Sequence, residues 1–383
     1  MLATVGMRPT VASEKAGTTD SIEVSLLTCA PHSEIYSLYG HTAIRFRNKA
    51  SGVDWTFNYG VFNFHKPYFA LRFAFGLTDY ELGVVPYRIF EREYKKDGRQ
   101  ITEQVINMTP AEKRRLYEAL MTNYMSEERV YRYNYFYNNC TTKARDMIEK
   151  CVYGRVVYHD NTQEGPVTYR EMIHHWTEGH HWAAFGNDLC LGVAADQPAT
   201  PRQQQFLPYN LMHSFASAQI VCDGVSRPLV KETRVVSEGR KQEAEDAFPL
   251  TPLACASLLL AVSLAAAIAE WRRGKTFKAL DFLLLSVSGL AGVVVFALLF
   301  SEHPTTSTNL QVLLLNPMPL IFLPAVLKGK TLFWRIYTFM IMLFLVCGIF
   351  QDYAEGMEIL ALCLLSRCLI HLGLAYKHKT NKA

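Results

Sequence analysis

The C-terminal third of the chain limits its possible structure most, because from Phe248 onward the sequence is a series of long apolar segments. A helix needs roughly 20 apolar residues to cross the hydrocarbon core of a membrane. Five segments meet this requirement, near residues 248–270, 279–300, 309–327, 332–350 and 357–376. Because short hydrophilic connections separate them, we expect residues 248–383 to form an all-α bundle of five antiparallel transmembrane helices.

Basic residues in the connections predict how this bundle is oriented. Two of the connections, residues 301–308 and 351–356, contain no Lys or Arg. The other two connections are basic, and so are the start of the fourth span and the C-terminus. Their basic residues are Arg272, Arg273, Lys275, Lys278, Lys328, Lys330, Arg335, Lys377, Lys379 and Lys382. Since loops rich in Lys and Arg stay in the cytoplasm, we expect a cytoplasmic C-terminus and residues 1–247 on the outer side of the membrane.

The first two thirds of the chain have the composition of a globular domain. Up to about residue 246, charges of both signs mix with many Tyr, His and Asn residues. The net charge of the chain is only +4 and no basic stripe is present, which excludes a nucleic-acid-binding protein. We expect residues 1–20 to be a residual signal or disordered segment. Residues 21–247 should form one domain, with a loop-rich extension from about residue 155.

The cysteines and histidines show no metal or cofactor pattern. The nine cysteines include no CxxC pair, so neither a zinc ribbon nor a disulfide framework is encoded. Cys190 and Cys222 are able to pair in an oxidising compartment, and the sequence leaves this open. Residues 174–181 (HHWTEGHH) lack a clean i, i+4 histidine pair, and Trp176 within them and Trp182 next to them fit a position near lipid headgroups equally well. We therefore expect no metal and no cofactor.

A hairpin near the start of the domain brings a histidine and an asparagine together. Residues 22–29, 39–46 and 53–58 have strand patterns, and a turn-like segment joins the last two. A turn centred between residues 49 and 50 sets His41 opposite Asn58, with Cβ atoms roughly 5 Å apart. The Asn58 carbonyl can then accept the imidazole proton and fix the tautomer of His41. A register change of one residue would move Asn58 to the other face.

A cysteine begins the second helix expected in this domain. The first helix begins with Thr109 as N-cap and Glu112 as its capping-box partner. A tyrosine-rich stretch follows and ends at Asn139, a turn or cap residue, and helical spacing begins at Thr141. Cys140 therefore sits at a helix N-terminus, where the helix dipole and free N–H groups lower the pKa of a thiol. The same N–H groups are able to hold an oxyanion.

These residues form the cysteine–histidine pattern of papain-like thiol enzymes, with the histidine first in the chain. That order resembles the circularly permuted branch of the NlpC/P60 superfamily, which includes lecithin–retinol acyltransferase-like (LRAT-like) enzymes. The chain also resembles the Lnb family, the lipoprotein N-acyltransferases of Bacteroidota. The motifs that carry this resemblance are Tyr39-Gly40-His41-Thr42-Ala43, Phe57-Asn58-Tyr59-Gly60-Val61-Phe62, Asn138-Asn139-Cys140-Thr141 and Ser301-Glu302-His303-Pro304. The ordered set, followed by the membrane bundle, covers nearly the whole chain.

The resemblance implies an α+β, permuted papain-like periplasmic domain followed by the transmembrane bundle, in a bacterial inner membrane. It implies a ping-pong acyl transfer from a phospholipid to the α-amine of a diacylglyceryl-cysteine apolipoprotein. In this reaction Cys140 is the nucleophile, His41 is the general base, and Asn58 is the expected orienting residue.

Further polar residues are candidates for substrate contact. In the soluble domain they are Tyr39, Tyr59 and Asn139, although the two tyrosines also fit simple packing roles. In the membrane domain they are His303, Asn309 and Asn316, on the outer side of the predicted topology. Asn316 precedes a Pro-Met-Pro sequence that should break its helix, and irregular backbone at membrane depth must face protein or water.

Two other functions compete with acyl transfer. A membrane-tethered cysteine peptidase or amidase acting on cell-wall peptide would use the same Cys140 and His41, but it would not need five spans. A non-enzymatic module that recruits a partner through its membrane domain is harder to reconcile with the presence of both residues. A lone cysteine is more often an inert core residue, so the case for Cys140 depends on the helix start and on His41.

Overall fold

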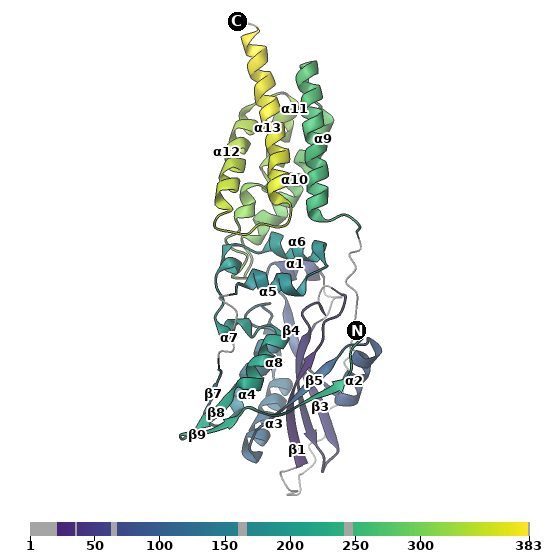
Figure 1. The fold of residues 1–383 in the computed structure, drawn as a ribbon, viewed down its shortest axis with the longest axis vertical. Coiled ribbons are helices and arrows are strands. Elements are labelled where there is room, and N and C mark those ends of the chain that lie inside the picture. The colour runs from purple at the N-terminus through teal and green to yellow at the C-terminus, as the bar shows by residue number, and fades with distance from the viewer. Residues whose placement is uncertain (1–20, 35–36, 63–66, 160–166, 241–247, 382–383) are drawn as a thin grey trace. The chain divides into compact units, whose positions relative to one another are not determined.

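The computed structural model describes residues 21–34, 37–62, 67–159, 167–240 and 248–381, so the expectation for residues 1–20 lies outside it. The chain divides into two compact units (Figure 1). The first comprises residues up to Val167 together with Ala199–Glu243, and the second comprises Thr168–Pro198 together with Ala244–Ala383. The units therefore do not follow the contiguous boundary expected near residue 247, because residues 168–198 pack with the apolar helices.

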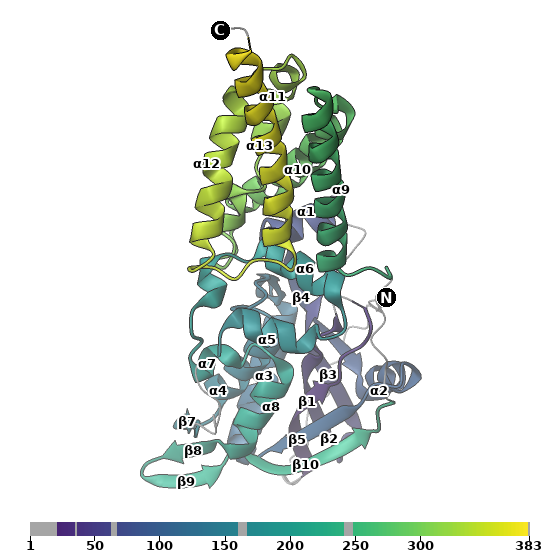
Figure 2. The same cartoon turned by 45° about the horizontal axis from the view of Figure 1, so that its top comes forward.

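The first unit is built on a seven-stranded antiparallel sheet with the order β10-β5-β1-β2-β3-β4-β6 (Figure 2). The strands expected from the sequence are all present. The sheet consists of β1 (Ile22–Cys29), β2 (His41–Asn48), β3 (Val53–Val61), β4 (Asp79–Pro86), β5 (Ile101–Ile106), β6 (Val130–Arg132) and β10 (Val230–Ser237).

Alternating side chains place a hydrophobic core on each face of this sheet. In β1, Val24 and Leu26 enter one core, whereas Leu27 and Cys29 enter the other. Helix α2 (Tyr87–Lys96) covers the second core. The first core is covered by α3 (Pro110–Met125), α4 (Cys140–Cys151) and α8 (Pro208–Ser217), and Figures 1 and 2 show α2 on the opposite side of the sheet from these three.

Capping side chains define where these helices begin. Thr109 and Glu112 form the predicted capping box at the start of α3.

The region from residue 155, expected to be loop-rich, contains further helices and a three-stranded sheet. In the first unit these elements are β7 (Arg155–Val157), α7 (Pro201–Gln204), β8 (Gln219–Cys222) and β9 (Val225–Pro228). The sequence reading underestimated them because each is short.

The second unit contains the apolar helices. Among the residues that the structure describes, four stretches are long and apolar enough to cross a membrane: Pro252–Arg273, Lys278–Leu298, Leu310–Leu327 and Met357–Thr380. The fourth predicted span is the shorter apolar helix Leu332–Cys347. The helices are α9 (Pro252–Arg273), α10 (Lys278–Leu298), α11 (Met318–Leu327), α12 (Leu332–Cys347) and α13 (Met357–Thr380). An α+β domain followed by a helical membrane region matches the expected fold class.

The third span is broken where the sequence predicted a break. A 3-10 helix, Leu310–Leu313, precedes α11, and the two are separated at Asn316 and Pro317. The backbone of Asn316 lies so close to Gly292 of α10 that a Cβ on Gly292 would overlap it. A glycine is thus required where the broken segment packs against α10.

Four ionisable side chains from three helices meet inside the bundle. Arg367 of α13 pairs with Glu270 of α9 at 2.7 Å and with Asp281 of α10 at 2.8 Å. Asp281 also contacts His371 Nε2 at 2.8 Å, and the His371 ring stacks on Trp334. Because both acids and Arg367 are almost completely buried, this cluster joins α9, α10 and α13 through mutual charge compensation.

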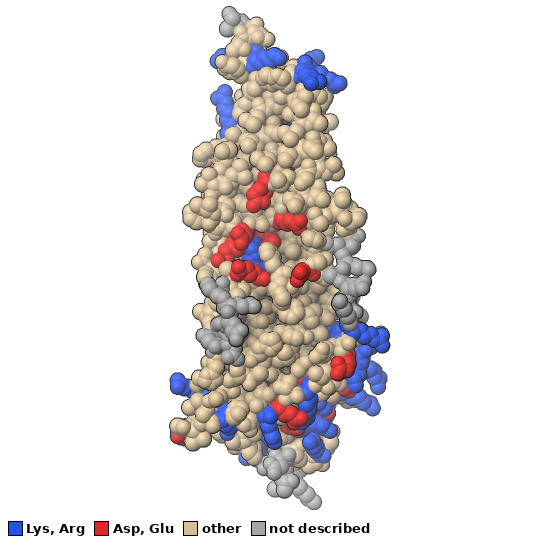
Figure 3. Space-filling view, viewed as in Figure 1, with Lys and Arg blue, Asp and Glu red and all other residues tan. Residues whose placement is uncertain are grey.

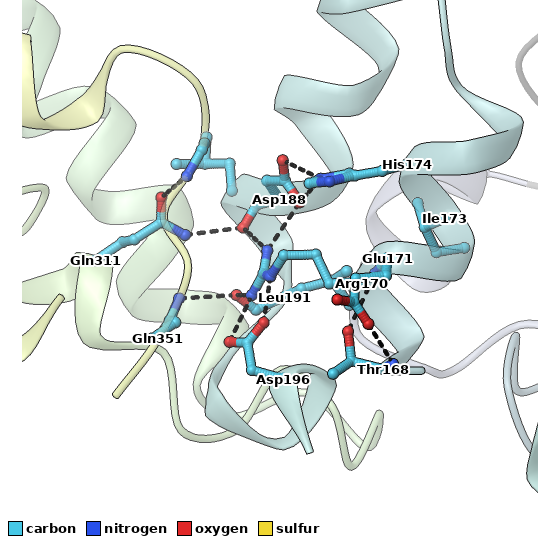
Figure 4. A network of polar contacts seen from close by, with 12 residues as sticks. Thr168, Arg170, Glu171, Ile173, His174, Asp188, Leu191, Asp196, Gln311 and Gln351 are labelled. Carbon is cyan, nitrogen blue, oxygen red and sulfur yellow. Dashed lines mark hydrogen bonds and ion pairs between the residues drawn. The ribbon is translucent and has the colours of Figure 1, made fainter. Parts of the chain in front are cut away.

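A second polar network holds the segment 168–198 to loops of the same unit (Figure 4). Arg170 of α5 (Tyr169–Trp176) is buried between Asp188 of α6 (His181–Cys190) and Asp196, with nitrogen–oxygen distances of 2.8 and 2.5 Å. Gln311 donates to the backbone carbonyl of Asp188, and Gln351 donates to that of Leu191. These bonds satisfy the open carbonyls at the end of α6 and explain why the segment belongs to this unit.

Candidate active site

His41 begins strand β2, and the register of the β2–β3 hairpin differs from the predicted one. Ile44 pairs with Phe57, so the turn is centred between residues 50 and 51 rather than between residues 49 and 50. The reason is local: the Asn48 side chain accepts hydrogen bonds from the backbone N–H groups of residues 50 and 51. Asn58 is therefore not directly opposite His41.

The predicted contact between His41 and Asn58 nevertheless forms. The observed pairing differs from the predicted one by two residues along β3. Because side chains alternate between the faces of a strand, a shift of two residues leaves Asn58 on the face that His41 occupies. His41 Nε2 lies 2.5 Å from Asn58 Oδ1. Since a carbonyl oxygen only accepts, Nε2 carries the proton, and Nδ1 is the ring nitrogen that can take a proton from a thiol.

Gly60 occupies the position that this register sets opposite His41, and the sequence analysis gave it no role. It adopts φ +98°, and a Cβ built on it would lie 3.4 Å from the Cβ of Cys140 and 3.7 Å from Cε1 of His41. Gly60 thus lies directly beside both reacting residues, and its positive φ favours glycine at this position. A glycine inside a strand pattern was the available signal.

Cys140 is the first residue of α4, as predicted, and Asn139 is the N-cap. The Asn139 oxygen accepts hydrogen bonds from the N–H groups of Thr141 and Thr142, and its amide nitrogen donates to the carbonyls of Tyr135 and Phe206. The N–H groups of Thr141 and Thr142 are thus occupied, and the oxyanion site expected at this helix start stays a prediction. The Asn139 side chain uses its hydrogen-bonding groups to position Cys140, and its substrate contact stays a prediction as well.

The thiol and the imidazole both lie beside Gly60 and shift each other's pKa. Burial alone would raise the pKa of Cys140. The charge of His41, together with hydrogen bonds from His41, the Thr42 backbone N–H and the Thr141 hydroxyl, outweighs burial and lowers the pKa to about 7. Burial likewise disfavours the imidazolium, but the thiolate and Asn58 outweigh it and raise the pKa of His41. A thiolate–imidazolium pair is therefore favoured near neutral pH.

A pair of threonines links the two halves of the site. Thr42 follows His41, Thr141 follows Cys140, and their hydroxyl oxygens lie 3.0 Å apart in the protein interior. Thr141 Oγ1 also lies 3.7 Å from Sγ of Cys140. Both threonines stand in the motifs quoted above, but a threonine has no individual signature of a catalytic role, so sequence reasoning assigned them none.

The two tyrosine candidates differ in their surroundings. Tyr59 is only 2% exposed, and its hydroxyl donates to Asn123 of α3 at 2.8 Å. It is a core residue, and its predicted substrate contact is not supported. Tyr39 is partly exposed and packs edge-on against Tyr135, so its substrate contact stays a prediction.

In the membrane unit, two of the three candidates have local structural roles. Asn309 is buried, donates to the Leu189 carbonyl and accepts from Gln351. Asn316 accepts from the backbone N–H of Met318 and so caps the helix after the break. Their polar groups serve the irregular backbone, and their substrate contact stays a prediction. His303 is partly exposed, and its role stays a prediction.

Within the part of the chain that the structure describes, no group of three or more His, Cys, Asp or Glu side chains is arranged to hold a metal ion. In the histidine-rich stretch, His174 contacts the Asp188 carboxylate and His181 contacts Glu355. All nine cysteines, including Cys190 and Cys222, are free thiols in the structure.

Comparison with protein families covers both units. A family model described as the Lnb N-terminal periplasmic domain matches residues 12–175, which include His41, Asn58 and Cys140. A second model, described as the Lnb transmembrane domain, matches residues 242–379. Together they cover most of the chain. No curated protein and no solved structure matches it significantly.

Proposed function

This chain belongs to the Lnb family, with a periplasmic domain followed by a membrane domain, and we propose that it is a lipoprotein N-acyltransferase of the bacterial inner membrane. The observation that supports this most is the pairing of Cys140, at the start of α4, with His41: both lie beside Gly60, and the charge of His41 lowers the pKa of the thiol. A thiol of lowered pKa beside an oriented imidazole is the machinery of covalent acyl transfer. The proposed donor is a phospholipid, and the proposed acceptor is a diacylated apolipoprotein.

In the first half-reaction, the Cys140 thiolate attacks an ester carbonyl of the phospholipid. The new S–C bond gives a tetrahedral oxyanion, and the C–O bond to glycerol then breaks. His41, protonated by the thiol, returns that proton to the departing glycerol oxygen. The products are a lysophospholipid and an acyl thioester on Cys140.

In the second half-reaction, the free α-amine of a diacylglyceryl-cysteine attacks the thioester. His41 accepts the proton that the nitrogen loses as the N–C bond forms, and the C–S bond breaks to release the Cys140 thiolate. Asn58 holds the imidazole in one tautomer during both steps, because it accepts from Nε2. The product is a triacylated lipoprotein.

The membrane domain suits this reaction because both substrates are anchored in lipid. An enzyme tethered to the same membrane meets them at raised effective concentration and does not need to extract them. Since Lys and Arg residues gather at the end of the bundle that carries the C-terminus (Figure 3), we propose that this end lies in the cytoplasm.

The first test isolates the first half-reaction. Purified protein in vesicles containing phospholipid, without any lipoprotein, should acquire one acyl group on Cys140, detectable by mass spectrometry and removable by neutral hydroxylamine. A Cys140→Ser variant should not acquire a hydroxylamine-labile group. Cys151→Ser is the matched control, because Cys151 is a buried thiol in the same helix and should leave acylation intact. Absence of acylation in the unmodified protein would refute the proposal.

The second test separates acyl transfer from cell-wall peptide cleavage. In cells that rely on the Cys140→Ser variant, lipoprotein N-termini should accumulate as diacylated forms, while cell-wall fragments should stay unchanged. The peptidase alternative requires the reverse result, with altered cell-wall fragments and normally acylated lipoproteins.

A further inference from the structure

The short helix α1 (Phe69–Ala74) and its flanks expose apolar side chains on the surface of the first unit. Tyr68 is 78% exposed, Leu71 is 58% exposed, and Leu77 is 40% exposed. Tyr68 also has φ 56°, a left-handed conformation that residues other than glycine rarely adopt. A cluster of exposed apolar side chains on one short element usually marks a contact surface.

The face of α1 that packs against the first unit is also apolar, and Arg72 is the one charged residue of this helix. Phe69 stacks on Phe62 at 5.6 Å, and Phe73 contacts Tyr133 at 6.0 Å between ring centroids. Tyr80 connects these two pairs, because it stacks on both Phe62 and Tyr133, with ring centroids 4.8 and 4.0 Å away. We call this connected set of five rings the aromatic circuit. Apart from Arg72, which donates to the Leu77 carbonyl and pairs with Asp79, α1 is apolar, so we expect a nonpolar medium or a partner to cover its exposed side.

This aromatic circuit extends to the proposed nucleophile. Burial raises the pKa of Tyr80, and the nearby Cys140 thiolate raises it further. The pKa of Tyr133 is raised by burial, by Tyr80 and by the same thiolate. These two rings therefore lie within electrostatic reach of Cys140, while the circuit's other rings carry the exposed helix. Tyr80 lies in the first hydrophobic core, and Phe62, Phe69, Tyr133 and Cys140 all pack against this core, so apolar side chains lie between α1 and the thiol.

Charge and chain length identify the nonpolar medium. Residues 62–78 contain Lys66 and Arg72 but no Asp or Glu, so nothing in this stretch repels anionic lipid headgroups. Strand β10 ends at Ser237, and the first apolar helix begins at Pro252. A chain of that length spans at most about 50 Å. The first unit is thus tethered to the membrane helices, so a bilayer is an apolar medium within the reach of this connection.

We propose that Tyr68, Leu71 and Leu77 form a lipid-contact surface that enters the outer leaflet of the bilayer. There Leu71 and Leu77 contact acyl chains, and Tyr68 lies at headgroup level, where amphipathic rings are favoured. The proposal rests on the acyltransferase function in one respect, because only that function requires a phospholipid ester to reach Cys140. The ester then moves from α1 along the aromatic circuit to the thiol. The lipid contact itself does not require catalysis.

Photocrosslinking tests the contact independently of activity. Leu71 is replaced by p-benzoylphenylalanine in a Cys140→Ala background, and the full-length protein is placed in phosphatidylethanolamine–phosphatidylglycerol vesicles with radiolabelled acyl chains. Irradiation should attach labelled phospholipid. The matched control is the same replacement at Val225 of β9, which is 71% exposed in the same unit and should give several-fold less label. Equal labelling at both positions, or crosslinks at 71 only to added apolipoprotein, overturns the proposal.

A second measurement separates failure of this proposal from failure of the proposed function. Leu71→Asp should slow acylation of Cys140 by vesicle phospholipid about tenfold, because a charged side chain cannot enter the apolar layer. Alkylation of Cys140 by iodoacetamide should be unchanged, which shows that the site is intact, and Leu71→Met should acylate normally. If Leu71→Asp acylates at the unmodified rate, the lipid-contact surface is wrong while the acyltransferase function stands. If crosslinking succeeds and no variant is acylated, the contact stands and the function is wrong.

Discussion

The hydroxyl oxygens of Thr42 and Thr141 lie 3.0 Å apart, and each threonine directly follows one of the two reacting residues. This contact fastens the start of β2 to the start of α4, and hence His41 to Cys140. Since the Thr141 hydroxyl donates to the sulfur, it can accept the proton of Thr42, which gives a chain of two hydroxyl groups that ends at the thiolate. The backbone N–H of Thr42 donates to the same sulfur.

Removing the Thr141 hydroxyl should raise the pKa of Cys140. In Thr141→Val the sulfur loses one of its donors, and the buried Thr42 hydroxyl loses its partner. We expect the pKa, about 7 in the unmodified protein, to rise by about one pH unit. The rate of iodoacetamide alkylation against pH measures it, because only the thiolate reacts. Thr141→Ser keeps the donor and should restore the original midpoint, so a midpoint that Thr141→Val leaves unchanged contradicts the proposed hydroxyl chain.

Changes at Asn58 should move the same midpoint in opposite directions. Asn58→Leu removes the acceptor that raises the pKa of His41, so less imidazolium supports the thiolate and half-maximal alkylation moves to higher pH. Asn58→Asp adds a negative charge at that position, raises the pKa of His41 further and moves the midpoint to lower pH. Shifts of the same sign in both variants would show that Asn58 acts only through packing.

Much of this fold is readable from the sequence because its signals are local. The alternation in residues 22–29 predicts β1 with its observed bounds, and Thr109 with Glu112 predicts the start of α3. Cys140 at a helix start follows from the asparagines before it and the helical spacing after it. Apolar length likewise locates the membrane helices, although α12 is shorter than expected.

What sequence reasoning missed depends on contacts distant in the chain or on competing turn geometries. The hairpin register follows from the Asn48 side chain in the turn, a choice between positions one residue apart. Gly60 matters because Cys140 approaches it from another element, and Asn139 proved to be a cap because two distant carbonyls take its amide protons. The assignment of residues 168–198 to the membrane unit depends on Arg170 and its partners, whose pairing no local pattern reveals.

Gly60→Ala should impair the site more than its effect on stability explains. The new Cβ would be in van der Waals contact with Cys140 and His41, and φ +98° would be strained for alanine, so any relaxation of that strain reaches the site. Gly52→Ala is the matched control, because Gly52 has φ +74° with nothing near the added Cβ. Each variant should lose about 1–2 kcal/mol of unfolding free energy from backbone strain. Only Gly60→Ala should also slow alkylation of Cys140, and equal slowing in Gly52→Ala would refute the close-approach argument.

The orientation of the membrane domain can be tested with reporter fusions. Because the end of the bundle with Lys377 and Lys379 is basic, a green fluorescent protein fused to the C-terminus should fluoresce, and alkaline phosphatase there should be inactive. Alkaline phosphatase inserted after Ser307, in a connection without Lys or Arg, should be active. An active phosphatase at the C-terminus would reverse the proposed topology.

The buried cluster around Arg367 should dominate the stability of the membrane domain. Arg367→Met keeps the volume but leaves Glu270 and Asp281 buried without their cation, so it should destabilise the domain by about 3–5 kcal/mol. Thermal unfolding in detergent measures the loss. Arg335→Met is the matched control, because Arg335 is an exposed arginine of α12 and its replacement should change stability by less than about 0.5 kcal/mol.

A triple variant distinguishes charge compensation from simple packing. Arg367→Met combined with Glu270→Gln and Asp281→Asn removes the uncompensated charges together, so most of the lost stability should return. If the single variant is as stable as Arg335→Met, the ion pairs contribute little to the bundle. If the triple variant is as unstable as the single variant, the loss arises from the shape of the arginine side chain and not from the charges it leaves behind.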